Sequence, residues 1–272
     1  MSASKAIPIP RKPALDLASV PRHWFGNSAV GTAIANGINM LFPAGERFFV
    51  RSVHHYLDRI DDPILLAQVK AFFKQEGLHA HAHDELNDVV RAHGFAIDDF
   101  LARYQTISSA VERASPPALR LAVTAAAEHF TAIMAEGAFA RGVLDNLHPQ
   151  MQELLAWHAA EEIEHKAVAF DVLRAVAPSY ALRMAGLALA TAMLGSFWAW
   201  ATIDLLRQEG MSLRRVRGEL RAAGEHDPVL RRVFLRGIRE YIRRDFHPSD
   251  NHNEHHARDW FAARGLPFTE AA

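Results

Sequence analysis

The sequence contains one short pattern twice, EGLH at residues 76–79 and EIEH at residues 162–165. Residues three apart share a face of an α-helix, so each Glu-x-x-His pair directs one carboxylate and one imidazole toward the same point. A single carboxylate, Glu46 or Glu128, precedes each pair at a similar distance. Two such pairs with two further glutamates are the ligand set of a carboxylate-bridged dimetal site in a four-helix bundle. The sequence therefore predicts an all-α, ferritin-like bundle with a dimetal centre.

The positions of the helix breakers support two antiparallel hairpins. Facing residues of a hairpin lie equally far from its turn, and Glu46 and Glu76 are centred on residue 61, beside Asp62-Pro63. An aspartate followed by a proline is typical of a helix start. Glu128 and Glu162 are centred on residue 145, where DNLHP at residues 145–149 is the strongest breaker in the region. Both predicted turns therefore place the two glutamates of their hairpin at the same height along the bundle.

Each side chain near this site receives an expected role. Carboxylate and imidazole ligands suit Fe, Mn or Zn, and Fe is the ion that we expect in a pair bound by four glutamates and two histidines. We expect Glu76 and Glu162 to bridge the two ions. The terminal ligands would be the carboxylates of Glu46 and Glu128 and the imidazoles of His79 and His165. Four neighbours serve either as extra ligands or as hydrogen-bond partners that orient the ligands: His83, His158, Glu161 and His129.

Composition narrows the class of protein. Half of the 272 residues are apolar, and the 30 basic and 31 acidic residues leave no net charge to attract nucleic acid. The chain has no cysteine, which excludes disulfides, thiolate zinc sites and iron–sulfur clusters and suits a reducing compartment. The first thirty residues contain four prolines and no apolar segment, so we expect no secretory signal and a cytoplasmic protein.

The pattern of apolar segments and breakers divides the chain into three regions, which we expect to pack as one domain. Residues 1–42 form an arm and a short helix, residues 43–176 the dimetal bundle, and residues 177–272 an apolar helix, basic helices and a His-rich tail. The expected bundle helices cover residues 43–59, 62–92, 117–144 and 149–175, with a connecting helix over 98–113. One long crossover of this kind is typical of ferritin-like bundles.

Residues 184–203 form the longest uncharged segment of the sequence. Twenty residues lie between Arg183 and Asp204 without a charge, and at 1.5 Å per residue a helix of this length spans a bilayer core of ~30 Å. Many of them are Ala, Gly, Thr and Ser, so our first expectation is a helix buried in the chain or in a homodimer. Contact with a membrane surface is the second reading, and a true span is the third.

Five motifs resemble the bacterial family of predicted metal-dependent hydrolases, which are similar to ferritin-like di-iron proteins. The longest is WHxxEExEHKxVAFD at residues 157–171, and the resemblance covers most of the chain. The family label implies hydrolysis with a metal ion and names no substrate. The other four motifs are FPxGExFF at 42–49, QExxHxxxH at 75–83, EHxT at 128–131 and DFHP at 245–248.

The predicted site favours an oxygen-activating di-iron oxidoreductase, or oxygenase, that oxidises a small or hydrophobic organic substrate. Its partners would be O2 and an external electron donor, because the sequence has no Gly-rich dinucleotide motif. The alternative is a metal-dependent hydrolase, in which one metal ion activates a water molecule and the other polarises the substrate. The third reading is a ferritin-like protein that binds metal without catalysis.

Large aromatic side chains flank the predicted ligands. Phe48 and Phe49 follow Glu46, and Trp157 precedes His158. Aromatic residues at helical spacing are most often part of the hydrophobic core. If they instead form the wall of a substrate pocket, that pocket should lie beside the ligands and against the helix over residues 184–203.

Overall fold

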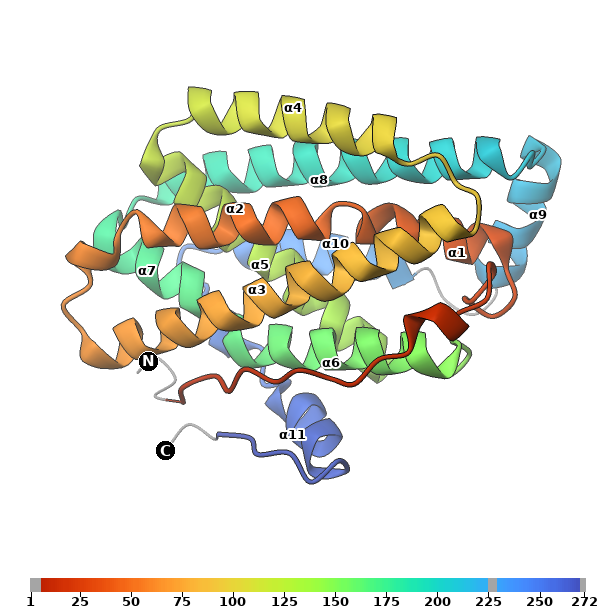
Figure 1. Cartoon of the computed structure of the whole chain (residues 1–272). Coiled ribbons are helices and arrows are strands. Elements are labelled where there is room, and N and C mark those ends of the chain that lie inside the picture. The colour runs from red at the N-terminus through yellow and green to blue at the C-terminus, as the bar shows by residue number, and fades with distance from the viewer. Residues whose placement is uncertain (1–5, 225–228, 270–272) are drawn as a thin grey trace.

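The computed structural model describes residues 6–224 and 229–269, and within these ranges the chain is helical without a β-strand (Figure 1). The predicted all-α class is confirmed. The α-helices in chain order are α1 (Ala29–Asn39), α2 (Phe42–His54), α3 (Pro63–Ala92), α4 (Asp98–Ala114), α5 (Pro117–Ala140), α6 (Pro149–His165), α7 (Val168–Val176), α8 (Tyr180–Gln208), α9 (Leu213–Gly224), α10 (Val229–Tyr241) and α11 (Glu254–Ala262).

The four helices that contain the predicted ligands, α2, α3, α5 and α6, share one start signal. Each has a proline in its first turn, namely Pro43, Pro63, Pro117 and Pro149. Proline fits this position because its ring fixes a helical φ and its missing N–H would have no partner there. Asp62 also caps α3 and accepts a hydrogen bond of 2.8 Å from the Ile64 amide. The two predicted turns therefore lie between α2 and α3 and between α5 and α6.

The helix expected over residues 149–175 is interrupted, which corrects the sequence prediction. α6 ends at His165, and α7 begins at Val168 after a turn. No proline or glycine occurs at this break, so the sequence pattern did not reveal it. The Lys166 side chain at the break is buried and donates hydrogen bonds to Asn253 Oδ1 at 2.6 Å and Glu254 Oε1 at 2.8 Å. The break is thus tied to the C-terminal segment.

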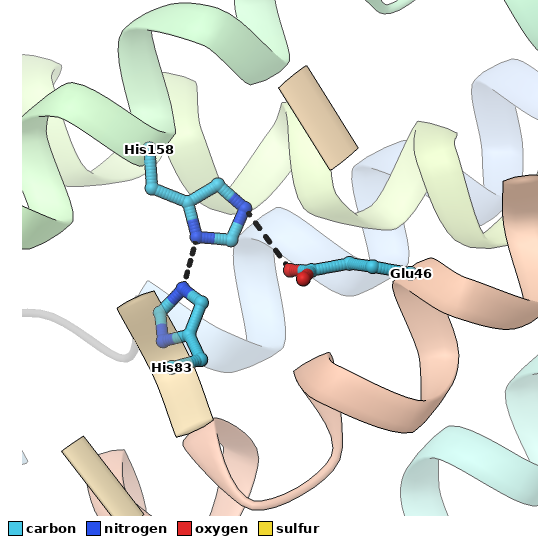
Figure 2. A group of neighbouring side chains, drawn as sticks. All are labelled: Glu46, His83 and His158. Atoms are coloured by element: carbon cyan, nitrogen blue, oxygen red, sulfur yellow. Dashed lines mark hydrogen bonds and ion pairs between the residues drawn. The ribbon is translucent and has the colours of Figure 1, made fainter. Parts of the chain in front are cut away.

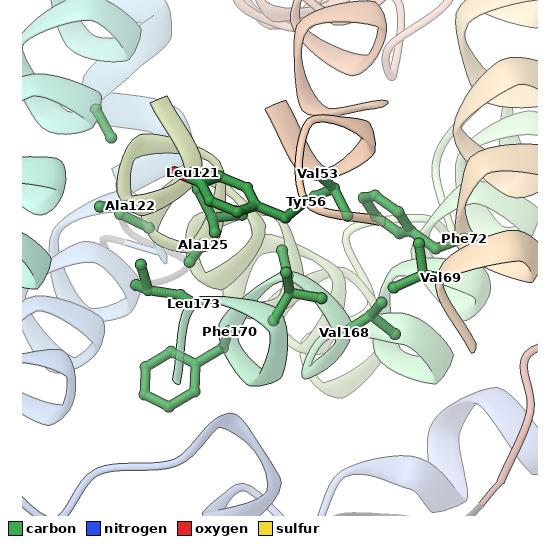
Figure 3. Close-up of a cluster of buried hydrophobic side chains, with 14 of the residues drawn as sticks. Val53, Tyr56, Val69, Phe72, Leu121, Ala122, Ala125, Val168, Phe170 and Leu173 are labelled. Atoms are coloured by element: carbon green, nitrogen blue, oxygen red, sulfur yellow. The ribbon is translucent and has the colours of Figure 1, made fainter. Parts of the chain in front are cut away.

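Two apolar clusters border the ligand-bearing turns. One joins α2, α3, α5 and α7 and includes Val53, Phe72 and Phe170 (Figure 3). The other contains Trp157 and several leucines of α3 and α6. Phe72 packs edge-on against the His165 ring at a centroid distance of 5.1 Å, and Trp157 packs edge-on against His79 at 4.8 Å. The predicted ligand histidines are therefore in contact with both clusters.

The remaining segments cover the ligand helices. The N-terminal arm runs along α6, α11 packs against α6, and α8 packs against α5 and α1 (Figure 1). α4 lies over α2 and α8, and Phe100 is its buried residue. The predicted division into three regions stays a prediction, and parts of the predicted arm (1–5), basic helices (225–228) and tail (270–272) lie outside the described residues.

α8 contains the uncharged segment over residues 184–203. Among the described residues it is the one helix that is long and apolar enough to cross a membrane, and 28% of its most apolar window is buried. A single helix of this kind is weak evidence for membrane contact. Burial in a homodimer, contact with a membrane surface and a membrane span stay predictions.

Close packing of α8 on α5 gives a test of the fold. A Cβ atom added at Gly186 would lie 2.5 Å from the backbone carbonyl carbon of Ala122, whereas nothing lies within 4 Å of a Cβ added at Gly195. Gly186→Ala should therefore push the helices apart and lower the free energy of unfolding by about 1–3 kcal/mol. Gly195→Ala should raise it by up to about 1 kcal/mol through helix propensity. Equal effects of the two changes in denaturant unfolding would contradict this packing.

Candidate metal centre

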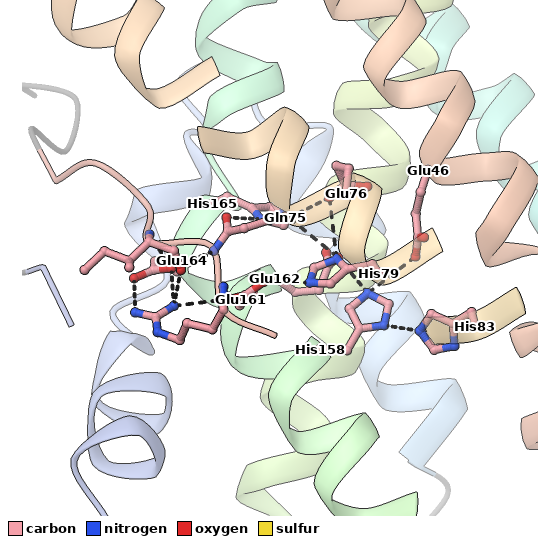
Figure 4. Close-up of polar contacts among 12 residues, drawn as sticks. Glu46, Gln75, Glu76, His79, His83, His158, Glu161, Glu162, Glu164 and His165 are labelled. Atoms are coloured by element: carbon pink, nitrogen blue, oxygen red, sulfur yellow. Dashed lines mark hydrogen bonds and ion pairs between the residues drawn. The ribbon is translucent and has the colours of Figure 1, made fainter. Parts of the chain in front are cut away.

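The six predicted ligands come from four helices and lie in the interior, and Figure 4 labels all of them except Glu128. Each is buried, with an exposed fraction of 4% or less. One oxygen or nitrogen atom of each of Glu76, Glu128 and His165 lies within 4.8 Å of the others, and the same holds for Glu46, Glu76 and His79. The structure therefore brings the glutamates of both hairpins to one place.

Glu76 and Glu162 lie between the two imidazoles. Glu76 Oε1 is 3.2 Å from His165 Nε2 and 3.8 Å from His79 Nδ1. Glu162 Oε1 is 3.5 Å from His165 Nε2 and 3.7 Å from His79 Nδ1. Each carboxylate thus faces both histidines, which is the placement that a bridging ligand needs.

The other two glutamates lie at the two ends of this arrangement. Glu128 Oε2 is 3.3 Å from His165 Nε2. Glu46 groups with Glu76 and His79, and its Oε1 is 3.7 Å from His158 Nε2. One half of the cluster therefore contains Glu128 with His165, and the other contains Glu46 with His79.

Several buried polar atoms at this point have no hydrogen-bond partner among the described residues. They include both carboxylate oxygens of Glu46, Glu76 and Glu128, together with His79 Nδ1 and His165 Nε2. A buried polar atom without a partner is costly, and such atoms in a native site often face an ion or a water molecule. All of these atoms belong to the predicted ligand set, so the residues present fit a pair of metal ions.

The far nitrogen of each ligand histidine is held by a hydrogen bond. His79 Nε2 lies 3.0 Å from Glu161 Oε2, and His165 Nδ1 lies 2.9 Å from Gln75 Oε1. These contacts leave His79 Nδ1 and His165 Nε2 facing the cluster. Partners of this kind fix the tautomer and orientation of metal-binding imidazoles.

Arg11 of the N-terminal arm supports these partners. Its backbone amide donates to Glu161 Oε1 at 2.9 Å, and its guanidinium donates to both oxygens of Glu164 at 2.9 and 3.0 Å. Glu164 in turn accepts a hydrogen bond of 2.8 Å from Gln75 Nε2. A single arginine therefore fixes Glu161 directly and Gln75 through Glu164, and Figure 4 labels these three partners.

His158 and His83 extend the cluster in one direction (Figure 2). His158 Nε2 lies 2.9 Å from Glu162 Oε1, and its Nδ1 lies 2.5 Å from His83 Nε2. His83 Nδ1 is 2.6 Å from Asn39 Oδ1. His158 also shares a group of possible ligand atoms with His79 and Glu162, and another with Glu46 and His83. Both readings of these two histidines, ligand or orienting partner, are compatible with this geometry.

The structure does not bring His129 to the cluster. Its Nε2 lies 2.9 Å from the Gly237 carbonyl oxygen, and its ring packs against Tyr241 and Phe246. His129 therefore connects α5 to α10. The adjacency of His129 to Glu128 in sequence is misleading because neighbouring residues on a helix point in different directions.

Sequence reasoning did not single out Arg11, Gln75, Thr131 or Asn39. Arg11 lies 150 residues from Glu161, and no periodicity connects an extended arm to a helix. Gln75 and Thr131 had a signal, since both occur inside the motifs at residues 75–83 and 128–131. Thr131 Oγ1 donates a hydrogen bond to Glu162 Oε2.

The crowding of carboxylates changes their ionisation. Burial, together with neighbouring glutamates, raises the pKa of Glu46 and Glu76 well above 4.5, and burial with Glu162 raises the pKa of Glu128 to about 7. Burial also opposes ionisation of Glu162, but His165 and His158 outweigh it and lower its pKa. Burial opposes protonation of His165, yet Glu162 and Glu128 raise its pKa above 6.5. Without metal, the cluster therefore retains protons at neutral pH.

An apolar cavity reaches the cluster at Glu46. Its lining includes Phe48 and Phe49 of α2 and Leu189 and Leu194 of α8. This position, beside the predicted ligands and against residues 184–203, is the one expected if the aromatic side chains form the wall of a substrate pocket. Trp157 does not line this cavity and instead packs against His79.

The buried cluster of glutamates and histidines agrees with one comparison to known proteins. A family model described as predicted metal-dependent hydrolase matches residues 9–252, which is most of the chain. The chain belongs to this metal-dependent hydrolase family. No curated protein and no solved structure matches the chain significantly.

Membership of the hydrolase family corrects the predicted reaction. The prediction of an oxygen-activating di-iron oxidoreductase is wrong, because the family is described as a hydrolase and nothing supports O2 activation. The alternative reading, a metal-dependent hydrolase, agrees with the family. The reason for the error is chemical: glutamate and histidine ligands suit metal ions of both reaction types, so the ligand set alone does not identify the reaction.

The raised carboxyl pKa values set the pH dependence of stability. Glu46 and Glu76 lose their protons at a higher pH in the folded chain than in the unfolded chain, so the folded chain binds more protons between the two pKa values. Stability must then fall as pH rises toward the folded pKa values. His165 acts in the same direction because its folded pKa is raised. Burial lowers the pKa of His79, which acts in the opposite direction near pH 6.5, where the unfolded histidine loses its proton, and has no further effect well above that pH.

We predict that the metal-free protein loses thermal stability between pH 6.5 and 8.5. Excess Zn²⁺ should remove this loss, because metal ions bind the deprotonated ligands and replace the protons. Glu76→Gln should weaken the pH dependence of the metal-free protein, since a neutral amide does not titrate. Calorimetric melting temperatures with chelator and with Zn²⁺ test this. A metal-free protein that becomes more stable over this pH range would contradict the assigned protonation.

Proposed function

We propose that the protein is a hydrolase with two metal ions, held by α2, α3, α5 and α6 in a ferritin-like four-helix bundle. The observation that carries the proposal is that Glu76 and Glu162 each face both His79 Nδ1 and His165 Nε2. In this arrangement Glu76 and Glu162 would hold both ions. Glu46 with His79 would complete the binding of one ion, and Glu128 with His165 that of the other.

The bundle geometry has support from the contact between its hairpins. Ser52 of α2 and Thr124 of α5 are joined by a hydrogen bond of 2.6 Å between their hydroxyl groups, and both residues are buried. This contact lies near the level of the ligands, because Glu46 and Glu128 are a few residues away on the same two helices. The hairpins α2–α3 and α5–α6 are therefore packed against each other through one helix of each.

A metal pair supplies Lewis acidity, which lowers the pKa of a water molecule and polarises an oxygen of the substrate. Hydrolysis adds the hydroxyl group of water to the electrophilic atom of the cleaved bond and gives the proton to the leaving group, so no electron donor is needed. Zn²⁺ and Mn²⁺ fit this redox-neutral reaction and this set of ligands.

The side chains around the ligands orient them. Glu161 and Gln75 fix His79 and His165, and Arg11 fixes Glu161 directly and Gln75 through Glu164. His158 Nε2 donates a hydrogen bond of 2.9 Å to the Glu162 carboxylate. Its Nδ1 contact with His83 fixes the ring. Trp157 and Phe72 exclude water from the faces of the ligand histidines.

We predict metal-dependent hydrolysis that does not need oxygen. The full-length protein loaded with Zn²⁺ or Mn²⁺ should hydrolyse p-nitrophenyl acetate or bis(p-nitrophenyl) phosphate at equal rates in air and under argon. Chelation should abolish the reaction. His79→Ala should lower kcat/KM by more than about 100-fold, since loss of a mere orienting partner already costs about 10–100-fold.

His81→Ala is the matched control for this variant. His81 lies on α3 two residues from His79, but its side chain is 59% exposed and faces away from the cluster. The His81→Ala variant should therefore retain the metal content and the hydrolysis rate of the unchanged protein. The proposed function would be contradicted if the protein binds Fe²⁺, Mn²⁺ and Zn²⁺ but hydrolyses neither ester with any of these ions bound.

A further inference from the structure

The cavity beside Glu46 has an apolar wall built by four helices. It lies among α2, α4, α5 and α8. Phe48, Val111, Val123 and Met193 contribute one wall residue from each helix. Apolar lining with a few polar groups is the usual composition of a small-molecule site.

The inner part of this cavity meets the proposed metal ligands. Glu46 lines it directly, and so does Thr131, whose hydroxyl group is bonded to Glu162. A molecule in the cavity can therefore contact the proposed ligand Glu46 of one hairpin and, in the other hairpin, Thr131, the hydrogen-bond partner of Glu162. The other ligands do not line the cavity, so Glu46 and Thr131 mark the point of contact.

The opposite part of the cavity is polar and reaches the surface. Arg51 and Glu112 line it and form an ion pair of 2.8 Å, in which the Arg51 side chain is 50% exposed. Arg120 of α5 lines the same end. Charged groups thus occur at the two ends, and the wall between them is mostly apolar.

The length of the cavity limits what it can contain. Arg120 and Thr131 lie eleven residues apart on α5, which corresponds to about 16 Å at 1.5 Å per residue. An extended chain advances about 1.2 Å per covalent bond, as in the protein backbone. A straight chain of about a dozen atoms therefore spans the distance from the polar end to the ligands.

We propose that this cavity binds the hydrocarbon chain of the substrate, which is a straight-chain amphiphile with its hydrolysable group at one end. The hydrolysable group lies at Glu46 and Thr131, and the chain extends along α5 toward Arg51 and Arg120. The hydrolysis of this substrate rests on the proposed function, whereas the binding of its hydrocarbon chain does not. This inference goes beyond the family description by assigning the chemical class of the substrate.

α4 offers a matched pair of variants. Ser108 lines the cavity and is half-buried, whereas Ala110, two residues later on the same helix, is exposed and does not line it. Neither residue belongs to an apolar cluster of the interior, so replacement disturbs the core little. Ser108→Trp should fill the cavity, and Ala110→Trp should leave it open.

The experiment is calorimetric titration of the full-length protein, metal-free and Zn²⁺-loaded, with straight-chain alkan-1-ols of four to ten carbons. The affinity should rise about fourfold per added methylene group, as expected for burial of a chain in an apolar site. Ser108→Trp should abolish this rise, and Ala110→Trp should retain it. Val123→Phe, which fills the cavity from α5, provides a second variant should Ser108→Trp fail to fold.

The outcomes separate this inference from the proposed function. An affinity that does not depend on chain length, or one that Ser108→Trp and Val123→Phe leave unchanged, would overturn the chain-binding role even if the protein hydrolyses p-nitrophenyl acetate. Chain-length dependence that the filling variants abolish would support it even if no hydrolysis is found, in which case the proposed reaction alone fails.

Discussion

The burial of four carboxylates in one place is the constraint on which the rest of this structure depends. Glu46, Glu76, Glu128 and Glu162 lie within reach of two imidazoles in a helical interior, and several of their oxygens have no hydrogen-bond partner among the described residues. Taking each ionised carboxylate out of water costs several kcal/mol unless a positive charge or a proton compensates. Protons compensate in the metal-free chain, and metal ions are the compensation that the ligand geometry favours.

Segments far from the cluster in sequence hold it in place. Arg11 bonds to Glu161 and Glu164, and its guanidinium packs over the ring of Phe261 in α11 at 3.6 Å. Lys166, directly after the proposed ligand His165, bonds to Asn253 and Glu254 in the C-terminal segment. The arm and the C-terminal helix therefore act on the residues next to the ligands rather than merely covering the surface.

The sequence was sufficient for the features that follow from helical periodicity. The Glu-x-x-His spacing and the prolines at helix starts placed Glu76, His79, Glu162 and His165 together because these signals are local. The break after His165 and the role of Arg11 were not predictable, since they depend on contacts with distant segments. His129 was misplaced because its partner, the Gly237 carbonyl group, lies on a helix that no local pattern relates to α5.

The reaction was the least predictable property, because ligands of this kind serve both oxidation and hydrolysis. Anomalous X-ray scattering from crystals of the Zn²⁺-loaded protein would show whether the cluster binds two ions. Two anomalous peaks should lie about 3.5–4 Å apart, the separation usual in two-metal sites. Both should lie within bonding distance of Glu76 and Glu162, one also near His79 and the other near His165. A single peak, or peaks outside this cluster, would contradict a dimetal centre.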